Sequence, residues 1–149
     1  MGTTVNQQPG RPAPRWLQKS FARLNVAVYR WSGGRYMNSI EGCPVCLVTM
    51  TGAKSGKQRT IPLMYVPDGE KVILVASQNG RPNNPAWHHN LIANPSIEVE
   101  VGSEKRMLQA RLATAEEKKD LWEVCFSCYP PFERYRRRTS RDIPIFVCE

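Results

Sequence analysis

Between residues 46 and 114, short apolar runs rich in β-branched residues alternate with turn-forming residues. The runs predicted as strands span residues 46–51, 60–66, 71–77, 97–101 and 106–114. Two connections, Pro67-Asp68-Gly69-Glu70 and Gly102-Ser103-Glu104-Lys105, are typical of hairpin turns. Short strands joined by hairpins favour an antiparallel barrel, so the expected fold class is α+β, mainly β.

Two helices are expected to interrupt these strands. The first covers residues 85–93, because Pro85 suits a first helical turn and Asn94-Pro95 ends the helix. The second runs from residue 114 to about residue 126, with Thr114 and Glu117 forming a capping box. Residues 143–148 are expected to form a closing strand, placed at a sheet edge by Pro144.

The N-terminal part of the chain differs in composition from the rest. Residues 1–14 are polar and proline-rich and lack the apolar stretch of a secretory signal, so we expect a disordered arm. Residues 15–31 have the spacing of an amphipathic helix, with apolar residues Leu17, Phe21, Leu24, Val28 and Trp31. This helix is too short and too charged to span a bilayer. It packs on the domain's own core or rests on anionic lipid.

The length of the chain indicates one domain, and its charge indicates the kind of partner. A chain of 149 residues fits one domain, expected over residues 15–149, and should bury about two thirds of its unfolded surface. Lys and Arg number 21 against 13 Asp and Glu, a net charge of +8. This excess favours an acidic partner, which is a polyanionic ligand, an anionic membrane surface or a nucleic acid.

The sequence T-G-A-K-S-G-K-Q-R-T, which follows the first predicted strand, is the segment richest in chemistry. A glycine-rich turn carrying Lys54, Ser55 and Arg59 offers backbone N–H groups, a hydroxyl and two cations to one anion, such as the phosphate of a cofactor. It is not a nucleotide-triphosphate loop, because Thr51 and Gln58 occupy positions where that loop needs glycine and Ser or Thr. The alternative is a solvated hairpin tip without a ligand.

Other polar clusters favour less specific roles. Cys43/Cys46 and Cys125/Cys128 have C-x-x-C spacing, but the long gap between the pairs favours reduced, buried cysteines, and no metal is expected. The adjacent His88 and His89 point about 100° apart on a helix, which disfavours joint metal binding. The basic run is expected to be solvated or to bind an acidic ligand rather than nucleic acid; it comprises Arg134, Arg136, Arg137, Arg138 and Arg141.

Four blocks together resemble one family over residues 24–149. They are T-G-A-K-S-G-K-Q-R-T-I-P-L, D-G-E-K-V-I-L-V-A-S, N-P-A-W-H-H-N-L-I-A-N-P and R-R-R-T-S-R-D-I-P-I-F-V-C-E. This order resembles the deazaflavin-dependent nitroreductases and quinone reductases that use coenzyme F420 (an 8-hydroxy-5-deazaflavin), found mainly in actinobacteria. The resemblance implies an antiparallel split β-barrel of the FMN-binding type with flanking helices.

The resemblance also implies site residues. The cofactor-binding set is Ala53, Lys54, Ser55, Arg59, Thr60, Ile61, Pro62, Leu63, Met64, Val75, Ala76, Ser77, Gln78, Ala86, Trp87, His88, His89 and Asn90. The substrate-binding set is Met64, Tyr129, Phe132 and Tyr135. Two positions depart from the family pattern: Phe132, where tyrosine is common, and Met64, where an aromatic is frequent.

The implied chemistry is hydride transfer from the reduced deazaflavin to a quinone, an activated enone or a nitroaromatic. Ser77, Tyr129 and Tyr135 are the expected catalytic residues, which polarise the acceptor or relay a proton, with water as the alternative donor. The lost hydroxyl at Phe132 weakens the expectation for nitroaromatic acceptors. An FMN enzyme of the same barrel type and a non-catalytic deazaflavin or lipid carrier stay open as alternatives. We expect a cytoplasmic monomer or weak homodimer, with peripheral membrane contact if the first helix meets lipid.

Overall fold

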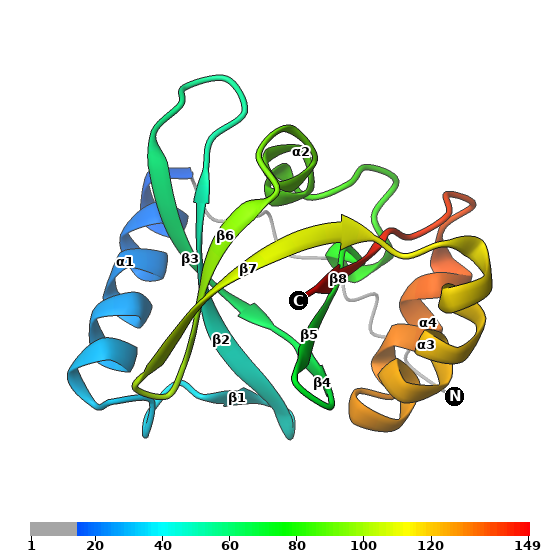
Figure 1. The fold of residues 1–149 in the computed structure, drawn as a ribbon, viewed down its shortest axis with the longest axis horizontal. Helices are drawn as coiled ribbons and strands as arrows, with labels where there is room; N and C mark the ends of the chain where they lie inside the picture. The colour runs from blue at the N-terminus through cyan, green and yellow to red at the C-terminus, as the bar shows by residue number, and fades with distance from the viewer. Residues whose placement is uncertain (1–14) are drawn as a thin grey trace, which may run out of the picture.

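One antiparallel sheet curls into a half-barrel, with helices on its outside and across one end (Figure 1). The computed structural model describes residues 15–149, excluding the side chains of residues 15–19 and 21; the arm predicted over residues 1–14 lies outside the described part. The sheet has the order β1-β2-β6-β7-β8-β5-β4, and β3 also pairs with β2. The strands are β1 (Ser39–Ile40), β2 (Cys43–Thr51), β3 (Gln58–Met64), β4 (Val66–Asp68), β5 (Lys71–Val75), β6 (Ser96–Val101), β7 (Glu104–Leu112) and β8 (Ile145–Cys148).

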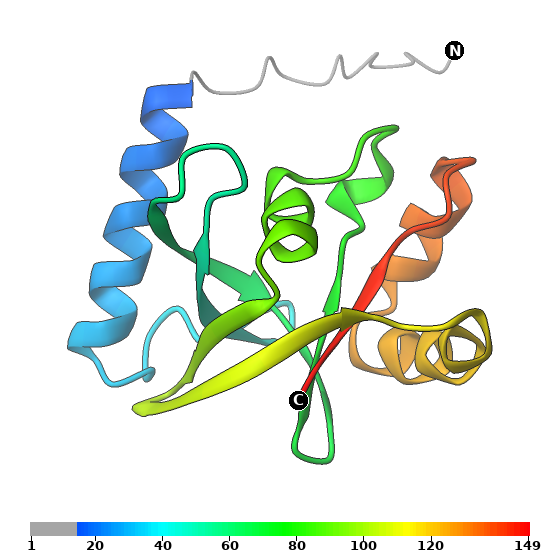
Figure 2. The same cartoon turned by 45° about the horizontal axis from the view of Figure 1, so that its top comes forward.

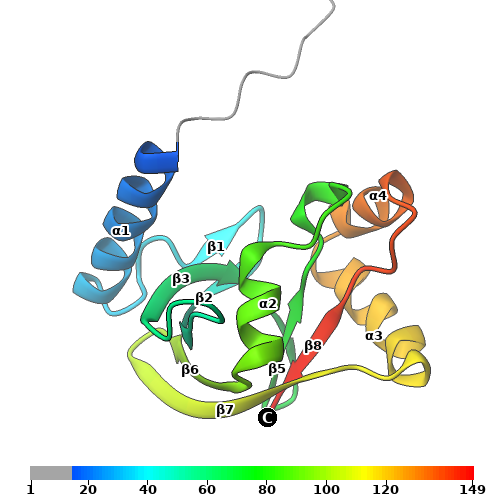
Figure 3. The ribbon, with the colours of Figure 1, turned by 90° about the horizontal axis from the view of Figure 1, so that it is seen from above.

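The helices cover different parts of this sheet. They are α1 (Arg15–Trp31), the short 3-10 turn η1 (Gln78–Gly80), α2 (Ala86–Ala93), α3 (Ala115–Cys128) and α4 (Pro131–Arg138). Helix α1 lies along one side of the half-barrel and α3 and α4 lie along the opposite side (Figure 2). Seen from above, α2 lies over the end of the half-barrel (Figure 3). The expected antiparallel split β-barrel with flanking helices is therefore confirmed.

One apolar cluster packs on each face of the sheet. Inside the half-barrel, Val48 and Leu74 pack around Phe146, which is 1% exposed. On the outer face, Ile73 packs with Trp122 of α3 under the two C-terminal helices. Because successive strand residues point to opposite faces, β5 is buried on both sides, which explains its unbroken apolar sequence.

Helix α1 is fixed to the β6–β7 hairpin by polar contacts. The Tyr29 hydroxyl accepts a hydrogen bond from the N–H of Gly102 at 2.7 Å. The Arg30 guanidinium donates to the Glu100 carboxylate, with Nη2 2.9 Å from Oε2, and Glu100 is only 6% exposed. The structure thus supports packing of α1 on the domain. However, Leu24 is 58% and Trp31 82% exposed, so these two residues of the expected apolar stripe do not face the sheet.

The predicted strands and helices are found, with shifted ends. The run predicted over residues 60–66 is interrupted at Tyr65, which separates β3 from β4. The capping box is confirmed, because Thr114 Oγ1 accepts from the Glu117 N–H and the Glu117 carboxylate accepts from the Thr114 N–H. Helix α4 was not predicted; its first turn begins with Pro131, a residue that needs no N–H partner there.

The prediction of an edge position for the last strand is wrong. Strand β8 lies between β5 and β7 and pairs with both. Pro144 lies just before the strand, where no ladder N–H is required, and its carbonyl accepts a hydrogen bond from the Ala76 N–H at 2.9 Å. Within residues 15–149, no helix is long and apolar enough to cross a bilayer.

Candidate cofactor and substrate site

The sheet is open between β3 and the end of β5. Strand β4 pairs with residues 71–73 of β5 only, so the outer edge of Leu74 and Val75 has no strand partner in the described sheet. Strand β3 pairs with β2 along one edge, and its other edge also has no strand partner there. The segments predicted to border the cofactor ring, around Ile61 and Val75, therefore lie on the two edges of this opening.

The β2–β3 turn is braced by its own hydrogen bonds. The Gly52 N–H donates to the Lys57 carbonyl at 2.8 Å, and the Gly56 N–H donates to the Gly52 carbonyl at 3.0 Å. The Lys57 N–H donates to Ser55 Oγ, and the Ala53 N–H donates to Asn90 Oδ1 of α2 at 2.9 Å. These four amides are therefore satisfied within the protein and are not available to an anion. The Ser55 hydroxyl keeps its proton to donate.

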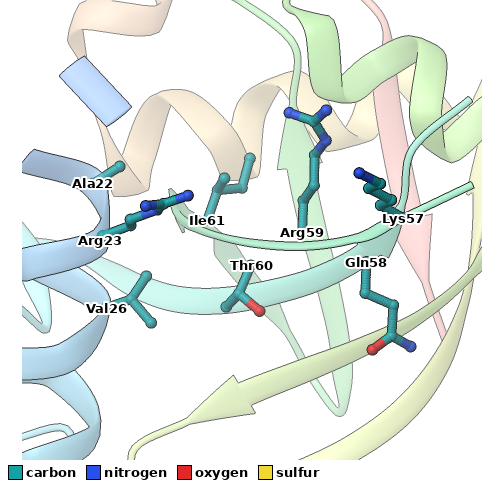
Figure 4. Close-up of a pocket in the computed structure, with 8 residues that line it drawn as sticks. All are labelled: Ala22, Arg23, Val26, Lys57, Gln58, Arg59, Thr60 and Ile61. Atoms are coloured by element: carbon teal, nitrogen blue, oxygen red, sulfur yellow. The ribbon is translucent and has the colours of Figure 1, made fainter. Parts of the chain in front are cut away.

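Cations from α1, from β3 and from the turn itself line a cavity beside this turn. The cavity has a volume of about 530 Å³. Its lining comprises Ala22, Arg23, Val26, Lys57, Gln58, Arg59, Thr60 and Ile61. Lys57 and Arg59 extend from one side of β3, while Gln58 and Thr60 extend from the other (Figure 4). None of the described lining residues is acidic, so the cavity suits a polyanion.

Arg59 and Ser55 converge on the turn. A Cβ atom built on Gly52 would lie 2.6 Å from Ser55 Oγ and 3.6 Å from Arg59 Nε. A side chain at residue 52 would displace the Ser55 hydroxyl, so the glycine lets this hydroxyl and the Arg59 guanidinium both lie beside it. Lys54 is exposed in the same turn. Arg23 and Lys57 were not in the predicted site; only the excess positive charge of the sequence pointed to them.

Other predicted cofactor-binding residues divide between the two faces of the sheet. Thr60 lies on the outer face, where its hydroxyl is 2.8 Å from that of Thr49 and where Pro62 lies opposite Leu47. Ile61 and Leu63 pack against the inner cluster. Met64 packs against the outer cluster beneath α3 and α4.

Helix α2 packs on the inner cluster and holds the β2–β3 turn through Asn90. Trp87 packs on Phe146 with ring centroids 5.8 Å apart, and His88 meets the same ring at 5.6 Å. Burial lowers the pKa of His88, helped by the neighbouring His89 and by Arg141, so the neutral imidazole is favoured. Ala86 and His89 are exposed.

The loop that follows β5 contacts α4. Ser77 is 8% exposed, and its carbonyl accepts hydrogen bonds from the Gly80 N–H and from Arg141 Nη2. Gly80 has φ +72°, and a Cβ there would lie 2.7 Å from the Tyr135 carbonyl oxygen. With its amide oriented to satisfy its neighbours, Gln78 donates to the carbonyls of Asn83 and Asn84. Ser77 thus lies in the loop that contacts the helix bearing Tyr135.

The predicted substrate residues form one aromatic cluster. The Tyr129 and Tyr135 hydroxyl oxygens are 3.4 Å apart, and the Tyr129 and Phe132 rings meet edge to face at 4.9 Å. Phe132 is only 3% exposed, so its observed role is packing. Met64 and Val75 pack against the same cluster. The hydrogen bond with Tyr135, followed by burial and Glu41, raises the pKa of Tyr129, so this hydroxyl stays protonated.

The cysteines and arginines have other contacts. Cys43 Sγ lies 3.3 Å from Cys128 Sγ, so thiols meet across the two C-x-x-C motifs rather than within them. Among the described residues, no three His, Cys, Asp or Glu side chains gather as metal ligands. Arg136 lies over the Trp122 ring and Arg137 pairs with Glu133. Arg141 differs from this surface run, because it donates to the Ala76 and Ser77 carbonyls.

Comparison with known proteins agrees with this geometry. A family model described as F420H(2)-dependent quinone reductase matches residues 21–149. An F420H(2)-dependent quinone reductase of Mycobacterium tuberculosis is 36% identical over 141 residues, which cover 89% of this chain and 95% of that protein. A solved structure described as an F420-H2 dependent reductase is 41% identical, with a TM-score of 0.67, and the match covers 71% of this chain and 94% of that one. Another, described as a domain-swapped dimer, is 33% identical, with a TM-score of 0.69 and coverage of 90% and 97%. The chain therefore belongs to the F420H(2)-dependent quinone reductase family, a family of oxidoreductases.

Proposed function

We propose that this protein transfers hydride from reduced coenzyme F420 to a quinone. The observation that carries the proposal is the 530 Å³ cavity beside the β2–β3 turn, where Arg23, Lys57 and Arg59 meet without an acidic neighbour in the lining. F420 carries a phosphodiester and an acidic oligoglutamate tail. A donor set of two guanidiniums, an ammonium and a hydroxyl fits such a group.

In this proposal the two edges of the sheet opening hold different parts of the cofactor. Lys54, Ser55 and Arg59 bind the phosphodiester, and Arg23 with Lys57 attracts the tail. Residues 60–64 lie beneath the ring system, and residues 75–78 border it. The remaining assigned residues, which flank the cofactor's side chain, are Ala53, Ala86, Trp87, His88, His89 and Asn90. When bound, reduced F420 supplies a hydride from C5 of its deazaflavin.

The acceptor is proposed to lie against the α3–α4 cluster. Reduction of a carbonyl places negative charge on oxygen, which requires a proton donor. The Tyr129 and Tyr135 hydroxyls, which lie together, and the Ser77 hydroxyl supply hydrogen bonds or a proton. Met64 and Phe132 provide apolar walls that keep water away.

Anaerobic stopped-flow assays test this function directly. F420H2 is mixed with the protein and with menadione, cyclohexenone or a nitroaromatic, and oxidation is followed by the return of F420 absorbance. We expect rapid oxidation by the quinone, with the enone and nitroaromatic as further proposed acceptors. Tight F420 binding without oxidation by any acceptor would favour the carrier alternative. Tighter binding of FMN than of F420 would favour a flavin enzyme.

We also propose peripheral membrane contact through α1, because Leu24 and Trp31 are exposed beside the basic Arg23 and Arg30. Leu24→Ser with Trp31→Ser should then reduce co-sedimentation with anionic vesicles, while neutral vesicles serve as the control. Unchanged binding would refute this contact. We expect the protein to be cytoplasmic and to be a monomer or a weak homodimer. Sedimentation velocity would measure its oligomeric state.

A further inference from the structure

Arg141 is the most extensively hydrogen-bonded arginine of the α4 region, and its partners are oxygens of one loop. Its Nε donates to the Arg81 carbonyl at 2.9 Å, and its Nη2 donates to the Ser77 carbonyl at 2.8 Å. Its Nη1 donates to the Ala76 carbonyl at 3.1 Å and to Asn84 Oδ1 at 2.7 Å. Among residues 15–149, no carboxylate forms a salt bridge with Arg141. A cation that bonds only neutral oxygens stabilises the conformation of the loop that supplies them.

The loop held in this way has an unusual backbone. Gln78 and Asn79 have φ values of 44° and 56°, in the left-handed region that side chains disfavour. Gly80 follows with φ 72° and touches the backbone of α4 at Tyr135. Strained backbone persists only where its surroundings determine it. The guanidinium on one side and α4 on the other are those surroundings.

We propose that Arg141 is a positioning residue of the hydride-transfer site, fixing the Ala76–Asn84 loop on α4 and so setting Ser77 relative to Tyr135. This inference rests on the proposed function, which assigns Ser77 and Tyr135 to the acceptor. Only an arginine can make all these contacts, because its planar fork presents five N–H donors in fixed directions. A lysine ammonium at the same position has three donors at a single point and cannot reach acceptors at both ends of the loop.

Kinetics of substituted proteins test the positioning role. Arg141→Lys keeps the charge and should leave the melting temperature and the F420 dissociation constant near wild type. It should lower kcat for menadione reduction by about 10- to 100-fold, because small displacements of a reacting group have effects of this size. Arg137→Lys on α4 is the matched control, since the Arg137 guanidinium pairs with the exposed Glu133, and it should leave kcat unchanged.

A double-substitution cycle separates positioning from a general loss of structure. If Arg141 acts through Ser77, Arg141→Lys in a Ser77→Ala background should lower kcat by less than about threefold, because the contribution of Ser77 is already gone. Equal losses in both backgrounds, or a wild-type kcat for Arg141→Lys, would overturn the proposal.

Amide hydrogen exchange gives a readout that needs neither cofactor nor activity. The Gly80 N–H donates to the Ser77 carbonyl and the Arg81 N–H donates to the Gln78 carbonyl, so both report on the loop. Arg141→Lys should speed their exchange by about tenfold or more while β2 and β6 exchange as in the wild type. Faster exchange in a protein that oxidises no F420H2 would refute the proposed function but support the loop contact. Unchanged exchange in an active enzyme would refute the role of Arg141 alone.

Discussion

The Tyr129 hydroxyl lies 3.4 Å from the Tyr135 hydroxyl, although one residue caps the C-terminus of α3 and the other lies within α4. The contact joins the two helices at the place where the acceptor is proposed to bind. It also makes each hydroxyl a possible replacement for the other as a donor. The pair is therefore expected to act as a unit.

Removing both hydroxyls should lower kcat by more than the two single substitutions together. Tyr129→Phe or Tyr135→Phe alone should lower kcat for menadione modestly, whereas the double variant should lose about 100-fold, the usual size of a general-acid contribution. Single-turnover rates at saturating F420H2 would measure this. Tyr36→Phe, an exposed tyrosine outside the cluster, is the control. Wild-type rates in the double variant would show that water supplies the proton.

The pH profile follows from the same contact. Hydrogen bonding with Tyr135 and burial raise the pKa of Tyr129 above its ordinary value of 10.0. The hydroxyl should therefore stay protonated, and kcat should show no alkaline decline up to about pH 9. A decline centred below that pH in the wild type, absent from Tyr129→Phe, would contradict this assignment.

Close contact between Gly34 and Gly102 should make Gly34 sensitive to substitution. A Cβ on Gly34 would lie 2.3 Å from the Gly102 Cα, whereas a Cβ on Gly33 would meet nothing within 4 Å; their φ values are +80° and +61°. Gly33→Ala thus measures the cost of a positive φ alone. We expect Gly34→Ala to lower the free energy of unfolding by about 1–3 kcal/mol more than Gly33→Ala, as overpacking does. Equal losses in urea denaturation would show that the hairpin moves freely away from α1.

Glu117 should make stability depend on pH in the acid range. Hydrogen bonds from Arg111 and from the Thr114 N–H lower the pKa of Glu117 from 4.5 to about 2. A lowered carboxyl pKa gives stability that is complete above the unfolded pKa of 4.5 and is lost as the pH falls through about 2. The difference in melting temperature between wild type and Glu117→Gln should therefore shrink over this range. Glu116→Gln, which removes a neighbouring carboxylate outside the capping box, should show little such change.

Mild oxidation should link Cys43 to Cys128, whose sulfur atoms are 3.3 Å apart. Diamide would remove two hydrogens from the thiols as the disulfide forms. The reaction should be slow at neutral pH and faster in alkali, because burial raises the pKa of Cys43 to about 12 and the thiolate is the reacting form. Peptide mapping would identify the link. A Cys125–Cys128 disulfide as the main product would contradict the observed arrangement.

The sequence predicts local elements well, because their determinants are local. The Thr114–Glu117 capping box and the hairpins at Gly69 and Gly102 follow from neighbouring residues, and all are present. The position of β8 depends on pairing with β5 and β7, and the composition of a strand does not identify its neighbours. Pro144 therefore misled the prediction for that strand.

The candidate site also depends on contacts between segments that are far apart in the sequence. The β2–β3 turn is visible as a motif, but the amides of Gly52 and Ala53 are satisfied internally, by the Lys57 carbonyl and by Asn90 of α2. Arg23 enters the cavity only because α1 lies beside β3. Arg141 looks like a member of a surface run until the loop carbonyls that it binds are placed around it.

The affinity for F420 tests the central claim most directly. Lys54→Ala with Arg59→Ala should raise the F420 dissociation constant by at least about 100-fold, since a hydrogen bond to a charged group contributes about 1.5–3 kcal/mol. Lys71→Ala with Lys119→Ala removes the same charge at exposed sites outside the cavity lining and should leave the constant nearly unchanged. A dissociation constant for the first variant within about threefold of that of the second, less than 1 kcal/mol, would mean that the cofactor binds elsewhere.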